Sequence, residues 1–448
     1  MNIMNRNITL ALLLAVGLGV QAQQLTLQQV RERALAHNIQ MRTADSAIAQ
    51  AREQKKEALT SYFPQVKATG IGFKSSTDII KTDVGLASVL PPSLAGALPA
   101  NIASALPTSI PVSALDHGVI AGVTAVQPVF AGGQIVNGNR LAKVGVEASE
   151  LQRQVAKNTV VLTAEQYYWQ IISLREKQRT LDAVASMLAN LEKDASLAVK
   201  AGVGMRNDLL QVQLKQNEVQ SNRLKLDNGL RLARMVLAQY IGAGDSVDVA
   251  APADITTLPP YPMIKEDHNS AVAATSEYQL LQKNVETATL QRKMEQGKLL
   301  PAVGVGAGYN YYDMGSGLDN NFAAVFATVS IPISQWWGGS HAVKRRRLAE
   351  ENARQQLDDN AELLKIRMQK NWNDVDDAYK QLVLAKKSIE QSEENLRLNR
   401  NYYHAGTVTM NDLLDAQQQY QQCRDRYTDA YAALQTKIVA YEQSVGRQ

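Results

Sequence analysis

The sequence lacks the residues on which most catalytic and metal centres depend. It has 448 residues but one cysteine, Cys423, so it can form no intramolecular disulfide and no cysteine-rich metal site. Its five histidines are scattered, and neither the H-E-x-x-H pattern of zinc proteases nor the G-x-S-x-G pattern of hydrolases occurs. We therefore predict that the protein is not an enzyme and that it holds no cofactor and no metal ion.

The sequence also has little net charge, because its 47 lysine and arginine residues are nearly balanced by 43 aspartate and glutamate residues. A global basic field of the kind that attracts nucleic acid is absent. Composition therefore argues against nucleic acid as a partner.

Long hydrophobic runs are missing as well. The run near the N-terminus, Ile8–Val20, has thirteen residues, whereas a helix needs roughly 20 apolar residues to span a bilayer. Arg6 precedes this run and Val20-Gln21-Ala22 follows it, which is the pattern of a secretory signal peptide. The sequence predicts a signal peptide over residues 1–22, cleavage after Ala22, and an exported protein without a transmembrane helix.

What the sequence does contain is a repeat. VKAGVGMRNDLLQV at residues 199–212 and YYHAGTVTMNDLLDA at residues 402–416 each hold a glycine followed five residues later by Asn-Asp-Leu-Leu. The two glycines, Gly202 and Gly406, are 204 residues apart. Both stretches therefore predict the same turn between two helices.

Other landmarks extend the repeat over the chain. Pro128 matches Pro332 at the same offset of 204, but Tyr62–Val66 matches Leu299–Val303 at an offset of 237. The first copy thus holds 33 extra residues (237 minus 204), which fall near residues 78–118. This stretch is rich in proline, alanine, leucine and serine, and we predict that it is a long loop.

Each copy is predicted to contain a helix, two strands, a very long helix, a turn and a final helix. The first copy covers residues 23–249, with helices at 28–60, 137–200 and 208–241 and strands at about 65–74 and 119–130. The second covers residues 264–448, with helices at 264–298, 340–404 and 412–445 and strands at about 302–312 and 322–332. A proline-rich linker joins them at residues 250–263. Apolar residues in the helices recur in alternating steps of three and four, as in a coiled coil, and Cys423 is expected to be a buried member of one such stripe.

The four predicted strands alternate in character. One face of the segment 302–312 takes Val303, Val305, Ala307, Tyr309 and Tyr311, and the other takes Gly304, Gly306, Gly308, Asn310 and Tyr312. Strands of about 9–11 residues with aromatic residues near their ends are typical of membrane barrels. The alternative is a soluble four-stranded sheet packed on the helices. Four strands cannot close a barrel, for which about eight is the smallest practical number, so membrane strands imply an oligomer.

The duplicated order and three motifs resemble the TolC-like outer-membrane factor (outer membrane efflux protein) family. The motifs are Gly202 with Asn207-Asp208-Leu209-Leu210, the stretch Gly406–Ala416, and Pro128-Val129-Phe130-Ala131-Gly132-Gly133. The resemblance covers nearly the whole mature chain. It implies a mainly α protein with membrane β-strands, which assembles as a homotrimer. A twelve-stranded β-barrel would lie in the outer membrane of a Gram-negative bacterium, continued into the periplasm by a twelve-helix α-barrel of coiled coils.

The resemblance also implies a function and partners. The protein would be the passive exit duct of a tripartite efflux or type I secretion system. It would dock through a periplasmic adaptor (membrane fusion) protein onto an inner-membrane transporter of the RND or ABC class. Residues 78–118 would then be an extracellular loop, residues 250–263 would lie in the equatorial region, and the turns at Gly202 and Gly406 would form the periplasmic tip.

Two aspartates are implied as the constriction of that tip, since Asp412 and Asp415 match the carboxylates that line it in the family. They are three residues apart and so share one helix face. Three chains would bring six carboxylates together, and such groups raise one another's pKa and attract cations. The residues alone leave simpler roles open, with Asn411 or Asp412 as a helix N-cap and Asp415 as a solvated position.

A latch is implied in the same way. Asp208 and Tyr403 match an inter-helix hydrogen-bonding pair that holds the tip shut, although Asp208 is explained equally well as a helix cap. Family members often carry an arginine two residues after the second glycine, where this chain has Val408. Arg206, from the first copy, is the candidate to replace it.

A basic run, Lys344-Arg345-Arg346-Arg347, comes after the last strand. It is either a solvated helix face or a contact with lipid phosphates at the inner leaflet of the outer membrane, because basic clusters beside membrane segments favour anionic headgroups.

A second class of function stays open, a secreted or periplasmic coiled-coil scaffold or adhesin without channel activity. It would use the coiled-coil stripes but would have no use for four strands of membrane length. The cargo of a duct is not encoded here either, because a passive conduit takes its specificity from its pump. Drugs, metal ions, peptides and secreted proteins are all compatible with the sequence.

Overall fold

The computed structural model describes residues 24–77, 79–85, 109–114, 116–244, 246–252, 255, 257–314 and 319–447. The predicted signal peptide, residues 1–22, lies outside the described residues. The chain divides into two compact units. Unit 1 holds the chain up to Gln50, Glu147–Asn284 and Ala353–Gln448, and unit 2 holds Ala51–Val146 and Val285–Asn352.

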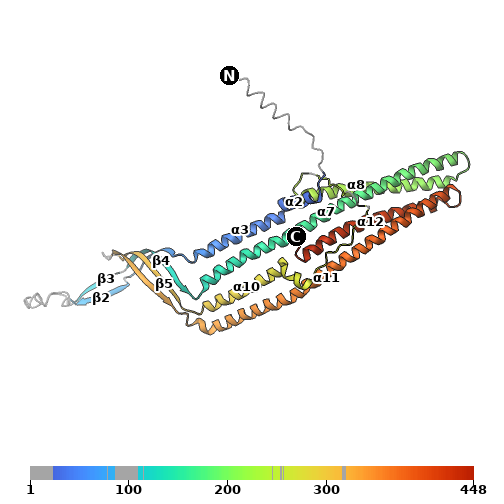
Figure 1. Cartoon of the computed structure of the whole chain (residues 1–448). Helices are drawn as coiled ribbons and strands as arrows, with labels where there is room; N and C mark the ends of the chain where they lie inside the picture. Colours follow the sequence, from blue (N-terminus) through green and yellow to red (C-terminus); the bar gives the residue numbers. More distant parts are fainter. Residues whose placement is uncertain are drawn as a thin grey trace, which may run out of the picture. The chain divides into compact units, whose positions relative to one another are not determined.

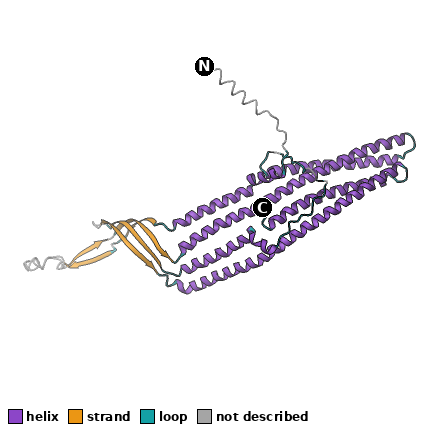
Figure 2. Ribbon diagram, in the orientation of Figure 1, coloured by secondary structure: helices purple, strands orange, loops and turns teal. Residues whose placement is uncertain are grey.

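The described chain is mainly helical and repeats one order of elements twice (Figures 1 and 2). The first copy runs α2 (Leu27–His37), α3 (Ile39–Thr60), β1 (Gln65–Lys74), β4 (His117–Ala131), α7 (Gln134–Lys200) and α8 (Arg206–Tyr240). The second runs α9 (His268–Ala271), the 3-10 turn η1 (Val272–Ala274), α10 (Ser276–Gly297), β5 (Ala302–Asp313), β6 (Asp319–Ser330), α11 (Gln335–His404) and α12 (Met410–Ser444). No helix among the described residues is both long and apolar enough to cross a membrane.

The first helix of each copy is broken, which corrects the continuous helices predicted at 28–60 and 264–298. Asn38 is extended (φ −63°, ψ 138°), and its side-chain oxygen accepts a hydrogen bond from the Gln40 N–H at 2.8 Å. Thr275 is extended as well (φ −75°, ψ 141°), and its hydroxyl accepts from the Tyr278 N–H at 3.3 Å. Both breaks follow from polar side chains that satisfy the first N–H groups of the next helix. They stand 237 residues apart, so they belong to the repeat.

The stretch at 78–118 is also more than the predicted loop. Strands β2 (Ile80–Gly85) and β3 (Ser109–Ala114) form an antiparallel two-stranded ribbon in which Thr82 pairs with Val112 and Val84 with Ile110. β-branched residues at every second position favour this pairing. The chain between the two strands, residues 86–108, lies outside the described residues.

Unit 2 contains a four-stranded antiparallel sheet with the order β1-β4-β5-β6. Its register places the side chains of all four strands on two common faces. The first, here called the apolar face, carries Val66, Ala68, Gly70, Gly72, Val119, Ala121, Val123, Ala125, Val303, Val305, Ala307, Tyr309, Tyr311, Ala323, Val325, Ala327 and Val329, together with Gln127 and Asn321 and, at the hairpin ends, Lys74, His117, Asp313 and Asp319. The second, the mixed face, carries Gln65, Lys67, Thr69, Ile71, Ile120, Gly122, Thr124, Gly304, Gly306, Gly308, Asn310, Phe322, Ala324, Phe326 and Thr328.

The apolar face has no partner among the described residues. Val325 is 88% exposed and Tyr309 is 55% exposed, although both would be buried in a soluble sheet packed on helices. The strands β1 and β6 stand at the two edges of the sheet. The sheet is therefore incomplete in two directions, at its apolar face and at its edges.

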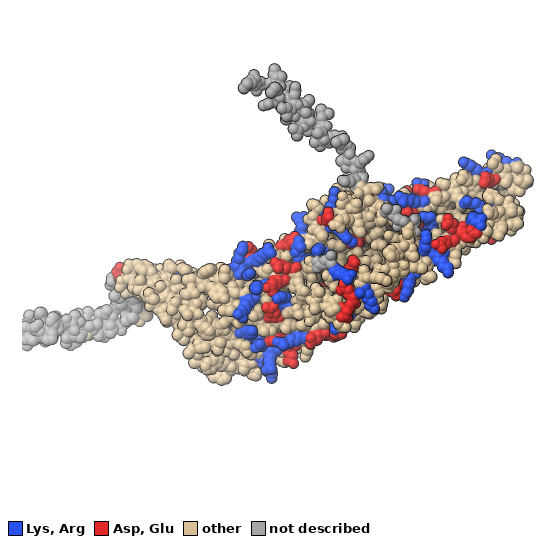
Figure 3. All heavy atoms as spheres, in the orientation of Figure 1, with Lys and Arg blue, Asp and Glu red and all other residues tan. Residues whose placement is uncertain are grey.

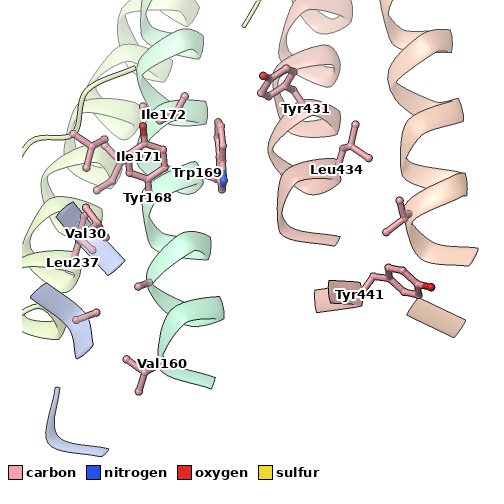
Figure 4. Close-up of a cluster of buried hydrophobic side chains, with 14 of the residues drawn as sticks. Val30, Val160, Tyr168, Trp169, Ile171, Ile172, Leu237, Tyr431, Leu434 and Tyr441 are labelled. Carbon is pink, nitrogen blue, oxygen red and sulfur yellow. The ribbon is translucent and has the colours of Figure 1, made fainter. Parts of the chain in front are cut away.

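Unit 1 holds the hydrophobic core. Figure 4 shows Tyr168 and Ile171 of α7 beside Val30 of α2 and Leu237 of α8, and all four side chains are at most 2% exposed. Burial of each side chain of this size contributes roughly 1.5–3 kcal/mol, so this cluster anchors the helices of the unit.

The predicted coiled-coil stripes pack in a second cluster near the turns. Leu188 of α7, Val212 of α8 and Leu413 of α12 are buried there. Cys423 is only half-buried, which corrects its prediction as a buried residue.

Candidate gating site at the interhelical turns

Two glycines close the turns that come after the longest helices. Gly202 has φ 75° and Gly406 has φ 72°, values that other residues adopt only with strain. The Gly202 N–H donates to the Val199 carbonyl at 3.1 Å, and the Gly406 N–H donates to the Tyr403 carbonyl at 2.9 Å. The next N–H in each turn reaches back to the carbonyl five residues earlier, so both are Schellman motifs.

The helix after the second turn has a capping box. Thr409 is the N-cap of α12, and its hydroxyl accepts from the Asp412 N–H at 3.2 Å. The Asp412 carboxylate in turn accepts from the Thr409 N–H at 2.8 Å and from the Thr409 hydroxyl at 2.6 Å. The expectation that Asn411 or Asp412 is the N-cap was therefore wrong by two or three positions. Both hydrogen bonds to the carboxylate lower the pKa of Asp412, and the one from the Thr409 hydroxyl contributes most.

Asp415 stands one turn further along α12 and is exposed. It forms no hydrogen bond and no ion pair with the described residues. Asp412 is exposed too, and the spacing of three residues places both carboxylates on one helix face, as predicted. Asp415 is thus the carboxylate that is fully available to a cation, whereas Asp412 is partly engaged by Thr409.

The first turn lacks such a box. Met205 is the N-cap of α8 and makes no side-chain capping hydrogen bond, while Asp208 lies in the first helical turn. The expectation that Asp208 caps the helix is therefore wrong. Its carboxylate instead lies close enough to Tyr403 to act on that side chain electrostatically.

Tyr403, next to the last residue of α11, packs against the second cluster of buried residues near the turns. It is half-buried, and burial raises the pKa of its hydroxyl, with a further contribution from the negative charges of Asp208 and Asp194. The Tyr403 hydroxyl forms no hydrogen bond with the described residues. The structure thus brings the two predicted latch residues near each other in one chain without bonding them. It also adds Asp194, which gave no signal in the sequence because it is a single acidic residue in a long helix.

Arg206 does not take part in this group. Its side chain is exposed and makes no ion pair with the described residues. Val408, at the position of the missing arginine, is half-buried. Within one chain, Arg206 therefore does not replace the arginine.

The basic run lies near the start of α11, in unit 2. Lys344, Arg345 and Arg347 are exposed. Arg346 is half-buried and donates to the side-chain oxygen of Gln291 at 2.9 Å, so it packs against α10 and is not a surface contact. Figure 3 shows many charged side chains over the helices, whereas the surface of the strands is almost entirely uncharged except at its far end.

Part of the chain matches a known protein family, and nearly all of it matches the fold of solved structures. Residues 275–447 match the profile of the family described as outer membrane efflux protein. A comparison with curated protein sequences finds no match. The fold matches solved structures over 94% of the chain, among them CusC, with 12% identity, 92% of that chain covered and a TM-score of 0.76. The second copy of the repeat therefore matches the outer membrane efflux protein family, and both copies share the fold of solved outer membrane channels.

Two further solved structures share the fold of this chain. VceC of Vibrio cholerae has 13% identity and a TM-score of 0.72, with 94% of this chain and 96% of that chain covered. The MtrE outer membrane channel of Neisseria gonorrhoeae, in an open state, has 15% identity and a TM-score of 0.73, with 94% and 89% covered. The family match lies in the second copy of the repeat, and the fold match extends over both copies.

The incomplete sheet is consistent with the matched family. An outer membrane efflux protein is a trimeric channel with a periplasmic helical extension that works with efflux pumps. A sheet with an exposed apolar face and two open edges, β1 and β6, is what one chain of such a channel is expected to carry. The matched family and the matched structures are outer membrane efflux channels and not enzymes.

Proposed function

We propose that this protein is the exit duct of a tripartite efflux or type I secretion system. The observation that carries the proposal is the four-stranded sheet with an exposed apolar face and two open edges, joined to long helices. Three such sheets make a closed barrel of twelve strands, which leaves no open edge in lipid. The helices continue the conduit into the periplasm.

The gate of this duct lies at the turns after α7 and α11. Three copies of α12 bring Asp412 and Asp415 around one axis, and Asp415 supplies the freer carboxylate. Rings of carboxylates attract cations, so the closed tip binds divalent cations. Asp208 and Tyr403 hold neighbouring helices together in this closed state, and Tyr403 stays half-buried beside the carboxylate.

Three kinds of partner follow from this function. A periplasmic adaptor protein joins the duct to an inner-membrane transporter of the RND or ABC class. The third partner is the lipid of the outer membrane. The exposed side chains of Lys344, Arg345 and Arg347 follow β6 in the chain, where they reach phosphate groups of the inner leaflet.

Fractionation and then native mass spectrometry test the proposed function. The expected result is recovery of the protein from detergent-extracted outer membranes with the mass of three mature chains. A soluble monomer in the periplasmic or secreted fraction contradicts the channel and supports a coiled-coil scaffold or adhesin.

A further inference from the structure

Lys67 is a charged residue inside a strand whose length and apolar face suit a membrane barrel. It is the third residue of β1, and its side chain is exposed. Charged residues at such positions are costly on the lipid side of a barrel and are common on the water-filled side. Which face of the sheet carries Lys67 therefore decides what it does.

The register answers this question. Lys67 pairs with Thr124 of β4, which pairs with Gly308 of β5, which pairs with Ala324 of β6. Directly paired residues in an antiparallel sheet point to the same side, so all four belong to the mixed face. Lys67 therefore points away from the apolar face that contacts lipid.

The two faces differ in where they place polar groups. On the apolar face the charged side chains are confined to the hairpin ends, as Lys74, Asp313 and Asp319. On the mixed face polar side chains lie along the strands, with Thr69 and Asn310 near Lys67. The mixed face is thus the side of the barrel that faces the water-filled lumen.

Among the residues that the structure describes, no group on the mixed face neutralises the lysine. Lys67 makes no hydrogen bond or ion pair with the described residues, and the four strands carry no aspartate or glutamate on the mixed face. Its paired neighbours Thr124, Gly308 and Ala324 are short. The ammonium group is therefore the most extended group of its row and reaches into the lumen with its charge uncompensated.

We propose that the three copies of Lys67 form a positively charged ring inside the barrel, which attracts solutes with carboxylate, phosphate or sulfonate groups. The inference rests on the proposed function, because the ring exists only in a closed trimer. It places two charge filters of opposite sign along one duct, acidic at the helical tip and basic in the barrel. Rings of lysine or arginine select for anions in pores.

Thiol labelling tests the position of the side chain without any current. In a Cys423→Ser background, single cysteines are placed by Val66→Cys, Lys67→Cys, Ala68→Cys and Thr69→Cys, and intact proteoliposomes are treated with a charged, membrane-impermeant maleimide. The expected labelling alternates, several-fold higher at positions 67 and 69 than at 66 and 68. The reverse alternation overturns the inference, because Lys67 would then face lipid. Equal labelling at all four positions shows instead that the sheet is not in a membrane, which contradicts the proposed function.

Reversal potentials of reconstituted trimers in a KCl gradient test the charge. They are measured in an Asp412→Asn, Asp415→Asn background, so that the barrel ring dominates. The K⁺ to Cl⁻ permeability ratio is expected to rise roughly two- to fivefold with Lys67→Gln and to rise further with Lys67→Glu. This is the effect expected when three unit charges act through water on an ion at a distance on the order of 10 Å. Lys74→Gln, on the opposite face of the same strand, is the matched control and leaves the ratio unchanged. A ratio that does not respond to the charge at position 67 overturns the inference, whereas channels that never conduct contradict the proposed function.

Discussion

Gly202 and Gly406 hold the same left-handed backbone conformation at the ends of α7 and α11, with φ values of 75° and 72°. The turns that they close share their backbone hydrogen bonds, but the helices after the two turns begin differently. The second turn leads into the capping box of Thr409 and Asp412, and the first leads into a helix whose N-cap, Met205, makes no side-chain hydrogen bond. The duplicated backbone thus carries two different sets of side chains, and only the second turn adds a capping box and the exposed carboxylate of Asp415 to the proposed gate.

The first prediction separates Asp415 from Asp412. Asp415→Ala should raise the concentration of divalent cation that half-blocks the channel by roughly tenfold, which corresponds to about 1.4 kcal/mol. Asp412→Ala should weaken the block less and should lower the thermal stability of the trimer, because its carboxylate also holds Thr409. Planar-bilayer conductance with added Mg²⁺ and thermal unfolding measure the two effects.

Thr409→Ala is the control for the capping box. It should cost about 1 kcal/mol of stability and leave the cation block in place. Unchanged divalent sensitivity in the Asp412→Ala, Asp415→Ala double variant would rule out the carboxylate ring.

The second prediction concerns the latch. Tyr403→Phe and Asp208→Asn should each increase the fraction of time that the channel spends in its high-conductance state, because each removes one member of the pair that holds the helices together. Asp194→Asn, which changes the other charge near Tyr403, is the matched control and should have a smaller effect. Single-channel recordings in which all three variants behave like the unaltered protein would show that these residues do not latch the tip.

The third prediction is a pH dependence of stability. Burial raises the pKa of Asp425 from 3.8 to about 6, with Asp429 adding to the rise and Lys177 opposing it. Because the folded state holds this proton more tightly than the unfolded state, the free energy of unfolding should increase as the pH falls from about 6 to about 4. Asp425→Asn should remove this increase and stabilise the protein at pH 7, by about 1 kcal/mol after allowance for solvent screening.

Asp429→Asn provides the opposite case on the same helix. Asp429 accepts a hydrogen bond from the Ser173 hydroxyl at 2.7 Å and from the Lys177 ammonium at 2.8 Å, so its replacement should destabilise the protein at pH 7. Unfolding curves at pH 4, 5, 6 and 7 compare the variants. A pH profile that is the same with and without Asp425 would contradict the assignment.

The fourth prediction tests the turns. A Cβ at Gly202 or Gly406 meets no atom within 4 Å, so the replacement by alanine acts on the backbone conformation alone. Gly202→Ala and Gly406→Ala should each destabilise the protein by about 1–2 kcal/mol, the cost of the left-handed conformation for a residue with a side chain. Gly229→Ala, inside α8 and equally open, should instead stabilise it by roughly 0.5–1 kcal/mol. Equal effects at the three positions in urea unfolding would refute the backbone argument.

Much of the fold is readable in the sequence because its signals are repeated. The offset of 204 relates the two turn glycines, and the alternation in 302–312 correctly assigns residues such as Val305 and Gly306 to opposite faces. A period of two or a glycine with positive φ is a local property, so one short stretch suffices to predict it.

The features that were missed depend on competition between local alternatives. The breaks at Asn38 and Thr275 arise because a polar side chain satisfies the N–H groups of a new helix, and the flanking sequence is equally compatible with a continuous one. In the same way, Thr409, Asn411 and Asp412 are all able to cap a helix, and only the backbone geometry selects Thr409. The distance between Tyr403 and Asp208 depends on how two distant helices pack, which no local pattern encodes.

Planar-bilayer recording of the protein extracted from outer membranes tests the central claim most directly. Purified trimers should give stepwise conductance, and divalent cations added on the side of the helical extension should reduce it. A purified protein that inserts into bilayers without producing steps, or that remains a soluble monomer, would contradict the assignment of this chain as an outer membrane channel.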